Sequence, residues 1–156
     1  MPQARAQPTQ AAGAGRALSL KGQALRLLAQ REHSRAELLT KLAGREVEPG
    51  QLQRILDELQ AKGFISEERV IESVIHRRAG KLGTARIHQE LQAKGLSPEA
   101  MAQAIEQLKG SELERARAVW THKFGEVAGE PRERARQVRF LMSRGFAAEV
   151  VRKIVG

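Results

Sequence analysis

One helix ending recurs three times in the sequence and constrains the fold more than any other feature. Residues 59–64 read Leu-Gln-Ala-Lys-Gly-Phe, residues 91–96 read Leu-Gln-Ala-Lys-Gly-Leu, and residues 141–146 read Leu-Met-Ser-Arg-Gly-Phe. A glycine that follows an apolar-periodic segment commonly ends a helix, because it adopts a positive φ at no steric cost. The chain therefore reuses one helical unit, which predicts a repeat architecture.

The spacing of the helix starts gives the length of this unit. Helices expected near Ala36, Ala85 and Ala135 start about 50 residues apart, and apolar residues recur at helical spacing from Leu20 onward. The sequence therefore predicts an all-α fold of three tandem three-helix, helix-turn-helix-like repeats that form an elongated, slightly curved array. The predicted divisions are a disordered N-terminal tail at 1–18 and repeats at 19–65, 66–110 and 111–156.

Local signals support the helices within each repeat. Ser34 with Glu37 and Ser111 with Glu114 have the spacing of a capping box, and Ser97 precedes a proline suited to the first helical turn. Aromatic residues make up 3% of the chain, so aliphatic helix packing must form most of the core. The single tryptophan, Trp120, is predicted to lie in the core of the third repeat.

Several classes of protein and site are disfavoured by composition. The chain has no cysteine, no apolar run long enough to span a membrane and no charged-then-hydrophobic leader, which favours a cytoplasmic protein that does not enter the membrane. The four histidines lack metal-ligand spacing and are expected at the surface or at boundaries between elements. No nucleophile, phosphate-loop or paired-carboxylate motif appears. We therefore expect no metal, no cofactor and no catalytic residues, and a protein that is not an enzyme.

The net charge of +9 and the pI near 10.8 predict attraction to a polyanion. Basic residues gather in two segments. The stretch 73–89 has no acidic residue, and its Gly80 and Gly83 would let the backbone approach a partner. The second segment is 132–144, in which Arg132, Arg136 and Arg139 share one predicted helix face by their i, i+4, i+7 spacing. For both segments the alternative interpretation is an ordinary solvated helix face or helix end without a binding role. The candidate contact residues are Arg77, Arg78, Lys81, Arg86, Lys94, Arg132, Arg136, Arg139 and Arg144.

A dense, ordered set of residues resembles the RecX family. It runs from Leu59 to Arg78 and continues through Lys81-Leu-Gly83, Arg86-Ile87 and residues 90–95, with a further likeness at residues 24–38. The resemblance covers Leu20 to Gly156. It departs from the family pattern at residues 67–71, where the family commonly has acidic residues followed by Arg-Phe-Ala and this chain has Glu-Glu-Arg-Val-Ile.

The resemblance implies a function that acts through binding. Such a protein docks in the groove of the RecA filament on single-stranded DNA, inhibits ATPase, recombinase and coprotease activities, and limits filament growth or promotes disassembly. We therefore expect the RecA filament as partner, with possible direct DNA contact and a monomer when free. Two alternatives remain open: a tandem helix-turn-helix protein that acts directly on duplex DNA, and a helical scaffold unconnected with nucleic acid.

Overall fold

A computed structural model describes residues 18–156, which form nine helices and no strand. The prediction for the tail therefore lies outside the described residues, except for Leu18. The nine helices are α1 (Leu20–Gln30), α2 (Arg35–Leu42), α3 (Gln51–Ala61), α4 (Glu67–Arg78), α5 (Thr84–Ala93), α6 (Pro98–Gly110), α7 (Glu112–Lys123), α8 (Pro131–Ser143) and α9 (Ala148–Val155).

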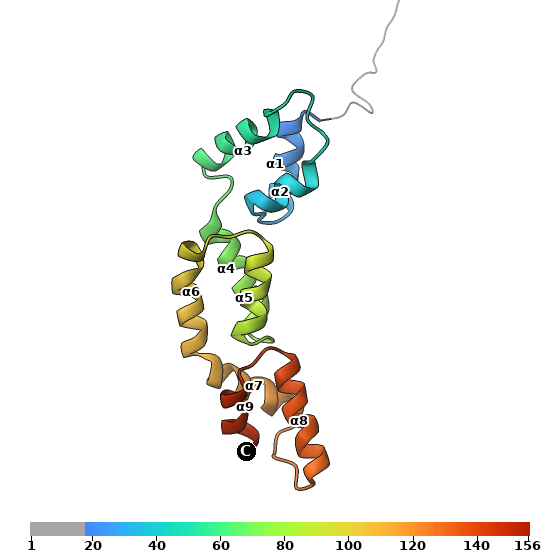
Figure 1. Ribbon diagram of the computed structural model, residues 1–156, viewed down its shortest axis with the longest axis vertical. Coiled ribbons are helices and arrows are strands. Elements are labelled where there is room, and N and C mark those ends of the chain that lie inside the picture. The colour runs from blue at the N-terminus through green and yellow to red at the C-terminus, as the bar shows by residue number, and fades with distance from the viewer. Residues whose placement is uncertain (1–17) are drawn as a thin grey trace, which may run out of the picture.

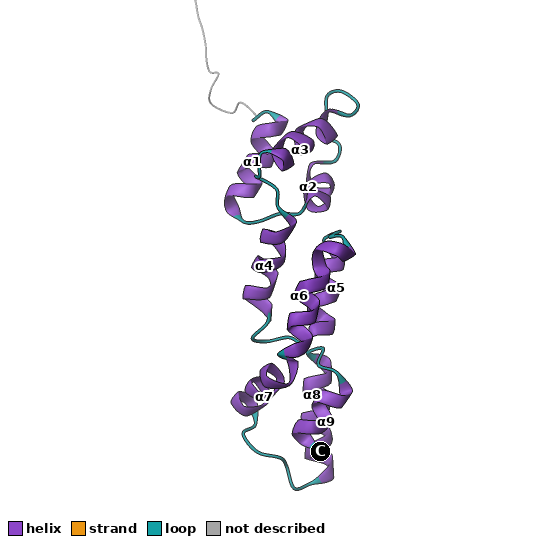
Figure 2. Cartoon of the chain, turned by 90° about the vertical axis from the view of Figure 1, so that its left-hand side faces the viewer, coloured by secondary structure: helices purple, strands orange, loops and turns teal. Residues whose placement is uncertain are grey.

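The helices group into three units of three that are stacked end to end along the long axis of the molecule (Figure 1). Turning the molecule by 90° shows the same order, with α1–α3 at one end and α7–α9 at the other (Figure 2). Each unit has its own cluster of buried apolar residues, centred on Leu38 and Leu56, on Val74 and Ile87, and on Trp120 and Leu141. The all-α array of three-helix units predicted from the sequence is confirmed.

The repeated helix endings adopt the expected conformation. Gly63, Gly95 and Gly145 have φ values of 85°, 76° and 91°, which an L side chain rarely adopts. In each ending a backbone N–H beyond the glycine turns back to the leucine five residues earlier, as Phe64 does to Leu59 and Phe146 does to Leu141. Shared chemistry at the three endings thus gives three equivalent chain reversals.

Helix starts agree with the sequence at two positions and differ at a third. Ser34 and Glu37 form the predicted capping box, and the Ser97 hydroxyl accepts from Ala100 N–H. The Ser111–Glu114 prediction was wrong, because the Ser111 side chain accepts no capping bond. The Ser111 hydroxyl donates instead to the Leu108 carbonyl, since α6 runs to Gly110 and leaves one residue before α7 begins.

Adjacent units meet through their second helices. The end of α5 lies on the start of α2, where the Ser34 hydroxyl donates to the Lys94 carbonyl at 2.6 Å. The end of α8 lies on the start of α5 in the same way, and Gly83 N–H donates to the Arg144 carbonyl at 2.7 Å. We call these contacts the first junction and the second junction. The array therefore grows by repeating one contact between the end of one helix and the start of another.

Candidate nucleic-acid interface

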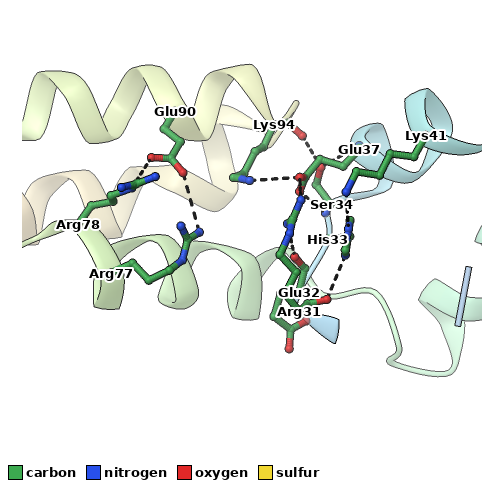
Figure 3. A network of polar contacts seen from close by, with 10 residues as sticks. All are labelled: Arg31, Glu32, His33, Ser34, Glu37, Lys41, Arg77, Arg78, Glu90 and Lys94. Atoms are coloured by element: carbon green, nitrogen blue, oxygen red, sulfur yellow. Dashed lines mark hydrogen bonds and ion pairs between the residues drawn. The ribbon is translucent and has the colours of Figure 1, made fainter. Parts of the chain in front are cut away.

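Arg77 and Arg78 end α4 and face α5, where both approach the carboxylate of Glu90 (Figure 3). Arg78 Nε donates to Glu90 Oε1 at 3.0 Å, and Arg77 Nη2 lies 3.9 Å from Glu90 Oε2. The two arginine side chains are 44% and 41% exposed. Glu90 therefore holds two of the predicted contact residues together while leaving much of each guanidinium open to a partner.

A cavity of about 420 Å³ opens beside this ion-paired group. Its charged lining residues come from two units: Arg78, Lys81, Arg86 and Glu90 from the second, and Arg144 from the third. Leu82 and Gln89 complete the lining. The sequence placed Arg144 with a separate basic segment, whereas the fold brings it to the first one.

Arg86 and Arg144 reach this cavity because the second junction is tightly packed. Arg86 Nη1 donates to the Ser143 carbonyl at 2.6 Å. A Cβ added at Gly83 would overlap backbone atoms of Gly145 and Phe146, and one added at Gly145 would overlap Arg86. Two glycines thus let the start of α5 and the end of α8 approach closely enough to assemble one cationic surface from two units.

Three arginines of α8 are exposed and lie outside the lining of this cavity. Arg132, Arg136 and Arg139 are exposed, and Arg136 lies 3.7 Å from Glu133. Arg144, at the end of the helix, places its guanidinium carbon 4.7 Å from the centroid of Phe140. The face predicted from spacing is therefore accessible, and Arg144, at the end of the helix, rests against an aromatic ring.

Lys94 lies at the first junction, away from the cavity. Its Nζ donates to Glu37 Oε2 at 3.2 Å, and only 14% of its side chain is exposed (Figure 3). Arg31 also donates to Glu37 Oε2, at 2.8 Å. The structure therefore gives Lys94 a role in joining the first two units.

Residues 18–156 contain no group of three His, Asp or Glu side chains placed to hold a metal ion. No helix in this range is both long and apolar enough to cross a membrane.

Three domains of one family match successive parts of the chain. The first, second and third three-helix domains of RecX match residues 21–59, 66–105 and 111–155. The chain belongs to the RecX family. Regulatory protein RecX of Leptothrix cholodnii is 54% identical to it over 138 residues, which cover 88% of each chain. Regulatory protein RecX of Ralstonia nicotianae is 46% identical over the same length, covering 88% of this chain and 87% of the relative.

Solved RecX structures share the fold. The crystal structure of RecX from Lactobacillus salivarius superimposes with a TM-score of 0.71 at 17% identity, covering 87% of this chain and 92% of that one. A second RecX crystal structure gives the same TM-score at 19% identity and covers 86% of this chain and 70% of that one. The RecX three-unit array therefore persists where few residues are shared.

Sequence reasoning missed two residues that hold the second and third RecX units together. Glu112 is 5% exposed, and its two carboxylate oxygens accept from Thr84 N–H at 2.9 Å and from Ala147 N–H at 2.7 Å. Arg115 donates to the carbonyls of Ala79 and Leu82. Their positions in the first turn of a helix fit an ordinary surface role, so no local signal could reveal contacts with α5 and α9.

His33 is buried, contrary to the prediction of a surface or boundary position. It is 1% exposed, and its Nδ1 lies 3.0 Å from the Arg31 carbonyl while its Nε2 lies 3.0 Å from Lys41 Nζ. Burial lowers the pKa of His33, which favours a neutral ring that donates from Nδ1 and accepts at Nε2. The residue helps to shape the turn before α2.

Acid should weaken the first RecX junction through Glu37. Burial by itself would raise the pKa of Glu37, but hydrogen bonds from Arg31, Ser34 N–H and Lys94 outweigh it and lower the pKa to about 2. Because the folded-state pKa lies below the ordinary value of 4.5, Glu37 stabilises the fold above that value, and this contribution is lost as pH falls from about 4.5 to about 2. Urea midpoints of Glu37→Gln should therefore fall less over this range than those of the wild type.

The exposed residue Glu72 provides the control for this experiment. Glu72→Gln should follow the wild-type acid profile. Equal acid sensitivity in Glu37→Gln and the wild type would show that the Arg31–Glu37–Lys94 network contributes nothing measurable.

Proposed function

We propose that this protein regulates the RecA recombinase by binding the filament that RecA forms on single-stranded DNA. The observation that carries the proposal is the pair of repeated junctions, which join three units into one elongated array. A partner made of repeating protomers is well matched by an array that can contact more than one of them, because each added contact raises the effective affinity. Membership of the RecX family, whose relatives are named regulatory proteins, supports the same conclusion.

The proposed effect is inhibition of the ATPase, recombinase and coprotease activities of the filament, by limiting its growth or promoting its disassembly. The protein acts by binding rather than by catalysis, in the cytoplasm, and is a monomer when free. Its net charge of +9 supports association with a nucleoprotein polyanion. We propose that the repeats divide at 19–65, 66–110 and 111–156. The proposed contact residues are Arg77, Arg78, Lys81, Arg86, Lys94, Arg132, Arg136, Arg139 and Arg144, of which Lys94 also joins two units.

The decisive measurement is the ATPase rate of the cognate RecA on single-stranded DNA as this protein is added at substoichiometric ratios and fixed salt. We expect strong inhibition by the wild type. Arg77→Ala/Arg78→Ala should need a roughly tenfold higher concentration for the same inhibition, because the loss of two contact arginines should cost about 1.4 kcal/mol in total, which corresponds to a factor of ten. The fold should survive, since both arginines are partly exposed and such ion pairs contribute little to stability.

The matched control removes two arginines elsewhere. Arg26→Ala/Arg54→Ala lowers the charge equally at exposed positions of the first unit and should inhibit as the wild type does. Equal inhibition by both double variants would exclude the Arg77–Arg78 surface and keep the function. No inhibition at excess wild-type protein would overturn the proposed function, and sequence-specific affinity for duplex DNA would then favour direct action on the duplex.

A further inference from the structure

The array has one unstacked second helix at each of its ends. The end of α5 lies on the start of α2, and the end of α8 lies on the start of α5, so the second helices of the three units run in the same direction. Within residues 18–156, no helix is stacked on the end of α2 or on the start of α8. Loops 43–50 and 124–130, beside these two helix ends, lie at opposite ends of the molecule in both views (Figure 1 and Figure 2).

A cavity of about 330 Å³, which we call the end cavity, opens beside the end of α2. It is lined by Gln23, Arg26, Leu27, Lys41, Leu42 and Arg45. Its charged lining residues are all basic, and the glutamates of loop 43–50 are not among them. Within residues 18–156, Lys41 Nζ lies 3.0 Å from His33 Nε2 and Arg45 donates to Gln23 Oε1, so neither cation pairs with a carboxylate. The end cavity therefore fits an apolar side chain with carboxylates beside it.

Loop 124–130, at the opposite end, carries the complementary groups. Val127 is 44% exposed, and the exposed Glu126 and Glu130 make no ion pair within the described part of the chain. The loop has no basic residue, although residues 111–156 hold ten basic and six acidic residues. Arg134 donates to two carbonyls of the loop, both at 3.1 Å, which holds its shape. An apolar side chain between two carboxylates is therefore exposed at this end.

The first junction shows how this chain pairs such ends. Lys94, after the end of α5, pairs with Glu37, in the first turn of α2, at 3.2 Å. The end of α2 again offers cations and the start of α8 again offers carboxylates, so the signs match in the same direction along the array. The backbone contact is not repeated, because Ala43 leaves α2 with a ψ of 139° where Lys94 leaves α5 with a ψ of 0°. Side chains must therefore make a contact between the two ends.

We infer that a second copy of this chain binds head to tail, with loop 124–130 of one copy seated at the end of α2 of the next. Val127 enters the end cavity, and Glu130 faces Arg45. Because the two surfaces differ, each added copy leaves one surface of each kind free and the row of copies stays open. This self-association goes beyond the proposed function and does not rest on it.

The association should be weak in dilute solution. No peptide connects the copies, unlike the units within one chain, and contacts that bury less than about 1,200 Å² typically give transient encounters. We expect a dissociation constant of roughly 0.1 to 1 mM, so the dilute protein is a monomer. A long partner that holds several copies in line raises their effective concentration and strengthens the row.

The test is sedimentation equilibrium of the purified full-length chain from about 10 µM to about 1 mM at low salt, which leaves exposed ion pairs unscreened. The mean mass of the wild type should rise with concentration and pass that of a dimer. Arg45→Glu and Glu130→Arg should each weaken association roughly tenfold, because like charges then face each other. Arg45→Glu/Glu130→Arg reverses both charges and should return the affinity to within about threefold of the wild type. Both positions are exposed, so the fold should not change.

A matched control and a cross-linking experiment locate the contact. Arg117→Glu/Glu72→Arg makes the same charge reversal at exposed positions on two other helices and should associate as the wild type does. The chain has no cysteine, so single cysteines report on chosen pairs. Mixed Val127→Cys and Arg45→Cys copies should form a disulfide roughly fivefold faster than Val127→Cys mixed with Glu72→Cys, because a disulfide needs Cα atoms within about 7 Å.

Four outcomes would overturn the inference. They are a monomer mass at the highest concentration, association that stops at a dimer, a double charge reversal as weak as the single variants, and equal cross-linking rates for the two cysteine pairs. None of these measurements uses the recombinase, so failure of this inference is distinguishable from failure of the proposed function.

Discussion

Replacing Glu112 by alanine is expected to lower the free energy of unfolding by about 4 kcal/mol, the largest loss that we predict for a single side chain of this protein. The carboxylate accepts from Thr84 N–H at the start of α5 and from Ala147 N–H before α9. It also lies 3.9 Å from Arg115, whose side chain is only 12% exposed. Its removal leaves two backbone donors and a largely buried cation without their anion, and such losses typically cost about 3 to 5 kcal/mol.

Urea unfolding would measure this effect, and two variants would locate its cause. Glu112→Gln keeps the volume and one strong acceptor, so it should lose roughly half as much as Glu112→Ala. Glu114→Ala, which removes an exposed carboxylate from the same helix, should cost less than about 1 kcal/mol. A loss as small in Glu112→Ala as in Glu114→Ala would show that water replaces the carboxylate at no cost. Faster hydrogen exchange at Thr84 and Ala147 in Glu112→Ala would assign the effect to the second junction.

Replacing Gly83 by alanine should lower the free energy of unfolding by about 3 kcal/mol. The added Cβ would overlap the backbone of Gly145 and Phe146, and backbone cannot rotate away as a flexible side chain can. The hydrogen bond from Gly83 N–H to the Arg144 carbonyl should break as α8 moves back. Overpacking of a tight contact typically costs about 1 to 3 kcal/mol, and the upper end applies because a backbone bond is lost as well. Urea unfolding measures this loss.

Gly80→Ala is a close control, since it lies three residues earlier in the same loop. A Cβ at Gly80 would meet nothing within 4 Å, so this variant should be as stable as the wild type or more stable by up to about 1 kcal/mol. If Gly83→Ala unfolds at the same urea concentration as Gly80→Ala, the close approach of α5 and α8 is absent in solution.

The two junctions repeat one geometry with different chemistry. The Lys94–Glu37 ion pair crosses the first junction, and Arg69–Glu32 is a further ion pair between the same two units. Backbone contact and the buried Glu112 carboxylate hold the second. Because salt screens exposed charges far more than buried ones, the Arg69–Glu32 pair, whose side chains are 44% and 31% exposed, should weaken with ionic strength more than the Glu112 contacts do.

Helix positions were predictable because their signals are local. The helices expected at 49–62 and 131–143 needed only apolar spacing and a stop glycine, and they lie at Gln51–Ala61 and Pro131–Ser143. Trp120 was placed in the third core correctly, since its apolar stripe sits on a single helix. The Ser111–Glu114 capping box failed because the spacing of two residues does not reveal that the preceding helix extends to Gly110.

Contacts between units were not predictable in the same way. Glu112 is bound by Thr84 and Ala147, which are distant in sequence, and nothing in its neighbourhood marks it as different from an exposed glutamate. Gly83 and Arg144 were both noted in the sequence, but as members of separate basic segments. Their adjacency depends on how α8 stacks on α5.

The sequence by itself determined the helices, the three repeated endings, the excess of positive charge and the resemblance to RecX. Each of these follows from residue spacing or composition and needs no knowledge of contacts between distant residues. Only the tertiary structure decided which charges meet. Stacking of the second helices, made possible by glycines at the contact, joined Arg144 to Lys81 and Arg86 and turned Lys94 toward Glu37. Such pairings depend on packing between residues some 60 positions apart, and local propensity carries no information at that distance.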